Sequence, residues 1–474
     1  MSADTEPVGT DLTAPGPTPG KTPASMTSPL RLAEGVELLG EFKNSAYSQP
    51  PSLVRRADGQ VIQMSPLLYQ VTSRIDGTRG SEAIAALVSA DLGRSLDAEQ
   101  VRYLITAKLI PLGVVVVGDA PRALPKANPL FALRARGTLL PERIVNVVGT
   151  CLGPLFRWPV VVAVVTTMLA VDYWLFFVHG LGGAIQQALH DPVDLLVVLG
   201  LSLASAVFHE CGHATACRYG GARPGVIGVG IYLVWPSFFT NVTDSYRLSR
   251  VGRLRTDLGG LYFNVVFMLA LAGIFAAAPS LQILLLVIAV THFEMLDQLL
   301  PFVRFDGYFI LSDVIGVPDL FARVVPIVKS ALPGGRGDPR VAGMRRSARI
   351  VVTGWVVCVI PLLLFLLGYL LLHLPAIDRA LWKSAGMQAH LMSAAVVAHH
   401  YAAAAVEAVG VVLLVLPGAG SLYVAVRLAR QVMLLGRRWS ADRPVRRLLA
   451  TGTGLAVIAA LAAVWTIQGQ FTGW

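Results

Sequence analysis

Residues 193–215 have the sequence VDLLVVLGLSLASAVFHECGHAT, an apolar run that ends in a group of ionisable side chains. Because a helix needs about 20 mostly apolar residues to cross a bilayer, this run is long enough to span one. Similar runs predict further spans at 158–178, 257–278, 281–301, 349–374, 398–424 and 447–467. The sequence therefore predicts a polytopic α-helical membrane protein with about seven spans.

The composition of the 474-residue chain supports the same class. Hydrophobic residues make up 54% of the chain and charged residues only 14%, whereas soluble proteins carry roughly 25% charged residues. So few charges cannot cover a soluble surface, and so many apolar residues exclude a chain that is mainly disordered. Four cysteines in 474 residues are too few for a fold held together by disulfides, and they include no CxxC pair.

The net charge of +10 is distributed unevenly between the two sets of loops. If the N-terminal region is cytoplasmic, the loops on that side carry roughly twenty Lys and Arg, and the opposite loops carry Arg379 and Lys383. The loops compared are 218–256, 302–348 and 425–446 on one side, and 179–192, 279–280 and 375–397 on the other. This bias predicts that the N-terminal domain and the ionisable end of the second span face the cytoplasm, and it explains the positive charge without a nucleic-acid partner. We expect the membrane to be a bacterial plasma membrane.

The residues before the membrane region divide by composition into three parts. Residues 1–30 are rich in Pro, Ser, Thr and Gly, so we expect a disordered tail. Residues 31–118 predict a small α+β domain, and residues 119–150 predict a basic linker. The membrane-embedded domain then occupies 151–474.

The α+β domain is expected to contain one hairpin and three short helices. Asp58-Gly59 is a typical hairpin turn between two runs that favour strands. Ser65, Ser81 and Asp97 are each followed by an amphipathic pattern, so we expect them to cap the three helices. Val114–Val117 can return as a strand, and this order of elements is typical of a winged helix.

The chemistry is concentrated in His209-Glu210-Cys211-Gly212-His213. Positions i and i+4 lie on one face of a helix, so both imidazoles can reach a single zinc ion at about 2.0–2.1 Å. The carboxylate of Glu210 can then act as a general base toward water at the zinc. Three ionisable side chains inside an apolar span need a partner, which a metal ion supplies. The alternative is that the histidines bond to neighbouring helices.

A third zinc ligand is expected far downstream. Catalytic zinc sites usually have three protein ligands and keep one position for water. Asp306 follows the fourth predicted span within the apolar stretch 301–308, and Gly307 would allow a sharp turn there. We therefore predict one zinc ion per chain, held by His209, His213 and Asp306.

At this point the chain resembles the site-2 protease family of intramembrane zinc metalloproteases. The HExxH motif at 209–213 and the later Asp306 followed by glycine match that family's metal motifs, which implies that Asp306 is the third ligand. Gly260–Asn264 matches a Gly-Pro-x-x-Asn element, except that Leu261 stands at the proline position. The resemblance implies that Asn264 binds the substrate backbone or the developing oxyanion.

Between the second and third predicted spans, residues 231–239 form an apolar segment interrupted by Pro236. We interpret it as a re-entrant hairpin or loop near the zinc. Such a hairpin would offer a strand edge to an extended substrate.

Three functional hypotheses remain open. The N-terminal region resembles PqqD-like leader-peptide recognition domains, so we first expect an endopeptidase that cleaves a small ribosomally synthesised precursor. The second hypothesis is regulated intramembrane proteolysis of a membrane-anchored signalling factor. The third is a non-enzymatic peptide-binding or export protein, although a purely structural metal would not need Glu210. In each case the partners are the lipid bilayer and a peptide or membrane-protein substrate.

Overall fold

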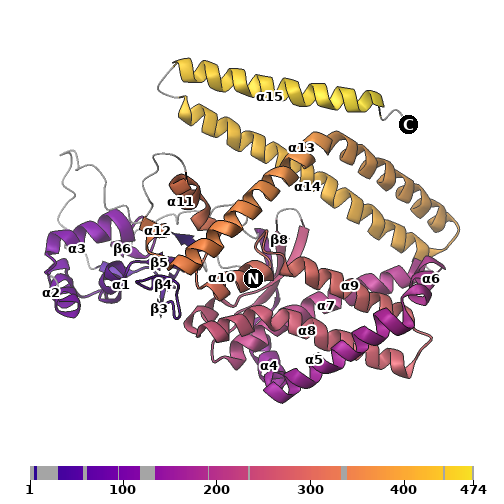
Figure 1. The fold of residues 1–474 in the computed structure, drawn as a ribbon, viewed down its shortest axis with the longest axis horizontal. Coiled ribbons are helices and arrows are strands. Elements are labelled where there is room, and N and C mark those ends of the chain that lie inside the picture. The colour runs from indigo at the N-terminus through magenta and orange to yellow at the C-terminus, as the bar shows by residue number, and fades with distance from the viewer. Residues whose placement is uncertain are drawn as a thin grey trace.

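The computed structural model describes residues 5–7, 30–56, 61–93, 95–117, 134–190, 192–232, 235–331, 339–440 and 444–471. Helices make up 73% of the structure, and N-terminal residues form a small α+β region, which is coloured indigo to purple at the left of Figure 1. Both features agree with the fold class expected from the sequence.

The N-terminal region forms a four-stranded sheet with the order β1-β5-β4-β3. Its strands are β1 (Thr5–Pro7), β3 (Glu37–Glu41), β4 (Ser52–Arg55) and β5 (Val61–Met64). The predicted hairpin is confirmed, because β4 pairs antiparallel with β5, although its Asp-Gly turn lies outside the described residues. Part of the predicted disordered tail forms β1, which pairs parallel with β5; residues 8–29 lie outside the described ranges.

Three helices follow this sheet, in the predicted order. They are α1 (Pro66–Ser73), α2 (Ser81–Leu92) and α3 (Ala98–Leu104). Ser65 and Asp97 cap their helices as expected, since the side chain of each accepts a backbone N–H bond. The expectation for Ser81 is wrong: it is the first helical residue, and Gly80 takes the cap position without a side-chain bond.

A second, two-stranded sheet completes the N-terminal region. The predicted returning strand is β6 (Val115–Val117), and it pairs antiparallel with β2 (Leu30–Leu32). Both strands contribute to a core of apolar side chains that also includes Val54, Ile62 and Ile84. The start and the end of this region are therefore joined by one packed core.

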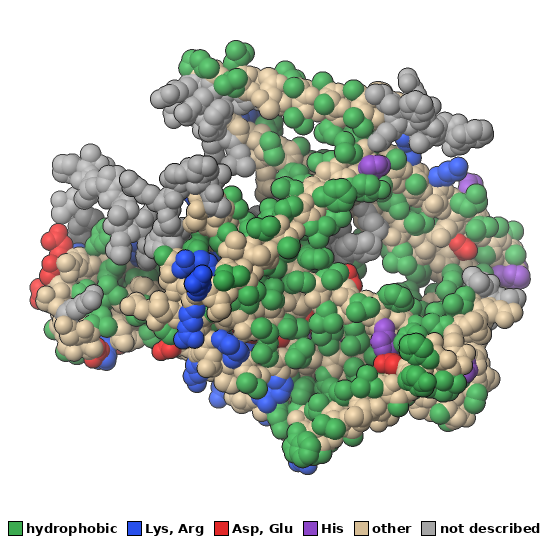
Figure 2. Space-filling model, viewed as in Figure 1, with side chains coloured by type: hydrophobic (Ala, Val, Ile, Leu, Met, Phe, Trp, Pro, Cys, Tyr) green, Lys and Arg blue, Asp and Glu red, His purple; other side chains and the backbone are tan. Residues whose placement is uncertain are grey.

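Among the described residues, five helices are long and apolar enough to cross a membrane. These candidate spans are Trp158–His179, Asp194–Tyr219, Arg250–Ala277, Arg346–Val397 and Tyr401–Leu434. They fit a membrane protein, and Figure 2 shows hydrophobic side chains spread over the outer surfaces of the helices. A group of Lys and Arg side chains lies between the helices and the N-terminal region in the same view.

The expected count of about seven spans is not confirmed. The fourth predicted span is α9 (Ile283–Leu299), which has only 17 residues. The predicted span 349–374 and the predicted outer loop 375–397 belong to one helix, α13 (Arg346–Val397). A straight helix of 52 residues would be roughly 78 Å long, more than twice the thickness of a bilayer core, but Figure 1 shows that α13 bends. Helices α14 (Tyr401–Trp439) and α15 (Pro444–Phe471) follow it.

The expected linker contributes to the membrane region. Within it, β7 (Arg134–Leu140) pairs with β8 (Ile227–Tyr232), and β8 pairs with β9 (Trp235–Thr240). Helix α4 (Glu142–Leu152) packs beside α7 (Pro192–Tyr219). The described part of the expected linker, residues 134–150, is therefore a strand and the start of a helix rather than a flexible connection.

Helix α7 crosses α8 (Arg250–Ala277) with the two backbones in direct contact. A Cβ atom added to Gly212 would lie 2.2 Å from the carbonyl oxygen of Gly259. A Cβ atom added to Gly259 would lie 2.6 Å from the carbonyl oxygen of Gly212. Only glycine fits at either position, and the crossing lies within the HExxH motif of α7.

Candidate metal centre

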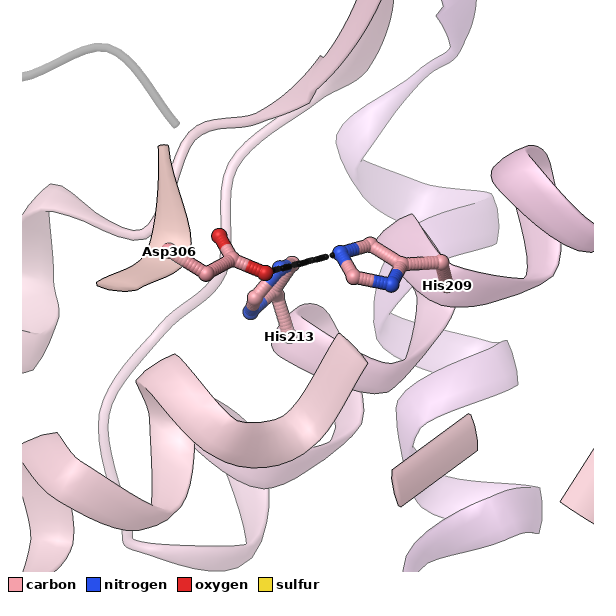
Figure 3. Close-up of side chains that lie close together, drawn as sticks. All are labelled: His209, His213 and Asp306. Carbon is pink, nitrogen blue, oxygen red and sulfur yellow. Dashed lines mark hydrogen bonds and ion pairs between the residues drawn. The ribbon is translucent and has the colours of Figure 1, made fainter. Parts of the chain in front are cut away.

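The three predicted metal ligands meet in the structure (Figure 3). His209 and His213 lie one turn apart on α7, and Asp306 is the first residue of α10 (Asp306–Ile315). Oδ2 of Asp306 lies 3.0 Å from Nε2 of His209 and 3.4 Å from Nε2 of His213. The two Nε2 atoms are 3.0 Å apart. All three side chains are buried, so the ligand atoms face one another away from solvent.

This arrangement fits a bound cation better than a set of hydrogen bonds. Nδ1 of His213 lies 2.8 Å from the carbonyl oxygen of Thr256, so that nitrogen must be the donor. The lone pair of neutral His213 is therefore at Nε2, where it faces His209 and the Asp306 carboxylate. Tetrahedral zinc ligands are separated by roughly 3.3 Å when each bond is about 2.0–2.1 Å, close to the distances here. The donor set thus fits zinc.

When the two histidines are protonated, they favour the ionised form of Asp306. Burial opposes ionisation of this carboxyl group, but the positive charges of His213 and His209 outweigh burial and hold the pKa of Asp306 well below its usual range. A deprotonated carboxylate is the form that a metal ion binds.

Two glycines make room for the centre. A Cβ atom on Gly260 of α8 would lie 2.3 Å from Nε2 of His209. Only glycine at this position therefore allows α8 to pack against the imidazole ring. A Cβ atom on Gly307 would lie 2.0 Å from the carbonyl oxygen of Leu299, at the end of α9. The expected reason for Gly307, a sharp turn, is wrong: it lies inside α10 without a positive φ, and close backbone packing requires it.

Glu210, the predicted general base, is held by a residue that the sequence did not indicate. Oγ1 of Thr240, the last residue of β9, lies 2.6 Å from Oε2 of Glu210 and 2.9 Å from its backbone carbonyl oxygen. The hydroxyl has one proton, so it donates to one of these oxygens at a time. Thr240 directly follows the apolar segment 231–239, but nothing in the sequence indicates its contact with Glu210.

Asn264 lies on α8 and bonds to a side chain of α7. Oγ of Ser205 donates to Oδ1 of Asn264 at 3.4 Å, and Ser205 stands one turn before His209. Asn264 is buried, and Leu261, at the expected proline position, does not interrupt α8. The predicted substrate-binding role of Asn264 stays a prediction.

Three further histidines lie in other parts of the described structure. His292 of α9 pairs with Asp172 of α5 (Trp158–Tyr173), with 3.2 Å between Nε2 and Oδ1. His399 and His400 are exposed between α13 and α14. Among the described residues, the group that could hold a metal ion is His209, His213 and Asp306.

One of the comparisons with known proteins found a similar sequence. The chain is 26% identical over 117 residues to a Bacillus subtilis (strain 168) protein named "Putative peptide zinc metalloprotease protein YydH". The match covers 24% of this chain and 46% of that relative, so it spans about half of the relative's length. No protein-family model and no solved structure matches the chain. The relative is named as a zinc metalloprotease, and the described part of this chain contains a buried His-His-Asp group that could hold a metal ion.

Proposed function

We propose that the chain is an intramembrane zinc endopeptidase that hydrolyses a peptide bond in a small, ribosomally synthesised precursor. The observation that carries this proposal is the position of Glu210. It adjoins a buried His-His-Asp group on a helix long enough to cross a membrane, and it bonds to the end of a β-strand. A structural metal site has no use for such a carboxylate.

Each of these residues has a separate role in the proposed hydrolysis. His209, His213 and Asp306 would hold the zinc ion, which supplies a Lewis acid and lowers the pKa of water when bound. Glu210 accepts a proton from the attacking water and passes it to the leaving amide nitrogen, so that an acid and an amine result. Thr240 orients Glu210 by donating to Oε2.

The position of β9 favours a substrate that binds in an extended conformation. This strand is the edge strand of the sheet β7-β8-β9, and its last residue contacts Glu210. A peptide that adds to this edge would be held without internal helical hydrogen bonds, so its carbonyl groups would be open to attack. The same argument requires that a helical substrate unwinds before it is cut.

The N-terminal α+β region is proposed to recruit the precursor on the cytoplasmic side. Its small sheet and the three following helices support peptide binding by strand addition. The excess of Lys and Arg in the predicted cytoplasmic loops supports this orientation of the N-terminal region and of the active site.

Peptide profiling of the native host tests this function. We would compare cells that carry the wild-type chain with cells that carry Glu210→Gln, using mass spectrometry of small peptides. A glutamine cannot accept the proton, so the uncut precursor should accumulate, with cleavage reduced about 10²–10⁴-fold. Glu407→Gln on α14 is the matched control and should leave the profile unchanged. Identical profiles for wild type and Glu210→Gln would rule out the protease, and accumulation of a membrane-anchored regulator would favour the second hypothesis.

A further inference from the structure

A second buried polar cluster lies next to the metal centre, around Arg253 of α8. This arginine is only 1% exposed, and its Nε donates to Oδ1 of Asp313 on α10 at 2.8 Å. Its NH1 group donates to the carbonyl oxygens of Leu248 at 3.0 Å and of Lys43 at 3.2 Å. The guanidinium also lies 4.0 Å from the centre of the Phe42 ring. One side chain therefore joins α8, α10 and the N-terminal region.

The position of Asp313 links this cluster to a metal ligand. Asp306 and Asp313 are seven residues apart on α10, so they lie two turns apart on nearly the same helix face. On α8, Arg253 precedes Thr256 by three residues, and the carbonyl of Thr256 accepts the bond from His213. The pair Arg253–Asp313 therefore holds together the two helices that present Asp306 and support His213.

The far end of α10 is held by the N-terminal region. We call residues 42–48 the docking segment. Its Ala46 donates a backbone bond to the carbonyl oxygen of Gly316, which ends α10, and accepts one from Arg345 before α13. Its Asn44 accepts a bond from Arg250 through its carbonyl oxygen at 2.6 Å. Helix α10 thus carries a metal ligand at its start and contacts the docking segment at its end.

We propose that Arg253 is a positioning residue that sets the place of Asp306 at the metal centre, with the docking segment as part of the same support. The inference rests on the zinc site of the proposed function but not on proteolysis. It gives the N-terminal region a second role, which is to stabilise the metal centre in addition to recruiting the peptide. Groups that orient metal ligands typically change metal affinity or activity by about 10–100-fold when removed.

Zinc affinity of the purified full-length protein in detergent tests the proposal. It would be measured by competition with a chelator of known affinity, alongside the helix content and the midpoint of thermal unfolding. Arg253→Met keeps the length of the side chain and removes the guanidinium, so zinc should bind roughly tenfold more weakly while helix content stays unchanged. Arg253→Lys should recover part of the loss, because a lysine can still pair with Asp313.

Arg56→Met is the matched control. Arg56 is also buried, and its NH1 group donates to the carbonyl oxygen of Leu112 at 2.9 Å, within the N-terminal region and outside the docking segment. Its loss should leave zinc affinity within about twofold of wild type, because this contact does not join α8 to α10. An equal loss of zinc in both variants would mean that any loosening of the N-terminal region matters, which contradicts the specific role of Arg253.

Phe42→Leu tests the docking segment itself. Leucine keeps most of the apolar volume but removes the ring beside the guanidinium, so zinc affinity should fall by about two- to fivefold. Unchanged affinity in Phe42→Leu would remove the docking segment from the support. Unchanged affinity in a folded Arg253→Met protein would overturn the proposal. If Arg253→Met does not fold, Asp313→Asn and Arg253→Lys provide the same comparison. No step of this experiment needs a substrate, so its outcome is independent of whether the chain is a protease.

Discussion

Helices α8 and α13 are both long and apolar enough to cross a membrane, yet they are packed differently. The protein buries 44% of the apolar stretch of α8 but 22% of that of α13. The buried side chains of α8 include Arg253, Thr256, Asp257 and Asn264, whereas those described as buried on α13 are all apolar. Polar groups are costly inside a membrane, so a helix that buries several of them is one that serves a site.

The glycines of the two helices show the same contrast. Gly259 and Gly260 of α8 are pressed against the backbone of α7 and the ring of His209. Gly354 and Gly368 of α13 have no neighbouring atom within 4 Å of an added Cβ. A glycine in an apolar helix is therefore informative only when its surroundings are known, and the following experiments use this contrast.

The metal content should separate the two regions most strongly. We expect about one zinc ion per purified chain, and a loss of nearly all of it in His213→Ala, because two ligands hold zinc poorly. Asp306→Ala should lose zinc in the same way. His400→Ala, between α13 and α14, should keep the full content. Metal analysis by mass spectrometry measures all four proteins, and zinc retained by Asp306→Ala would remove that residue from the ligand set.

The glycine contrast predicts the next largest effect. Gly260→Ala places a methyl group where the ring of His209 now lies, so α8 must move and zinc affinity should fall at least tenfold. Gly354→Ala fills open space on α13 and should stabilise that helix by about 0.5–1 kcal/mol without changing zinc affinity. Chelator competition and thermal unfolding measure the two quantities. Equal zinc affinity in both variants would show that the helix crossing tolerates a side chain.

Local geometry was sufficient for one part of the site, because helical spacing predicted that His209 and His213 share a helix face. Asp306, almost a hundred residues later, was expected from its place after the fourth predicted span and from the resemblance to the site-2 protease family, and the structure brings its carboxylate beside both imidazoles. Thr240 could not be predicted, because its contact with Glu210 depends on how the hairpin β8–β9 packs against α7. The role of Gly307 was misjudged for the same reason, since the carbonyl that it meets belongs to the preceding helix.

A loop charge and a span boundary were predicted wrongly in two other places. Arg253 was counted as a cytoplasmic loop charge, but the structure buries it between α8 and α10. Pro361 and Pro375 lie inside α13, which continues through the loop predicted at 375–397. Proline is tolerated in apolar helices when neighbouring groups satisfy the freed carbonyls, so it does not mark the end of a span there.

A smaller effect is expected at Thr240. Thr240→Val keeps the shape of the side chain and removes the hydrogen bond to Glu210, so cleavage should slow by roughly tenfold while zinc stays bound. Thr166→Val on α5 is the control, because that exposed hydroxyl donates to the carbonyl of Val162 in its own helix. Activity on the precursor identified by peptide profiling measures the difference. If Thr240→Val is as active as Thr166→Val, β9 does not orient the general base.

The smallest expected effect comes from the removal of one hydrogen bond from α8 and one from α15. Tyr262 of α8 donates its hydroxyl to the carbonyl of Leu155 at 2.8 Å, and Trp465 of α15 donates its indole N–H to the carbonyl of Leu371 at 3.0 Å. Tyr262→Phe and Trp465→Phe each remove one donor, worth about 1 kcal/mol. If α8 belongs to the cooperative core and α15 rests on its outside, only Tyr262→Phe should lower the midpoint of thermal unfolding of the zinc-bound protein. Zinc affinity should stay unchanged in both variants, since neither side chain contacts a ligand. Equal lowering of the two midpoints would mean that α15 unfolds together with the metal centre, and the division of the molecule into a site-bearing core and outer helices would then be wrong.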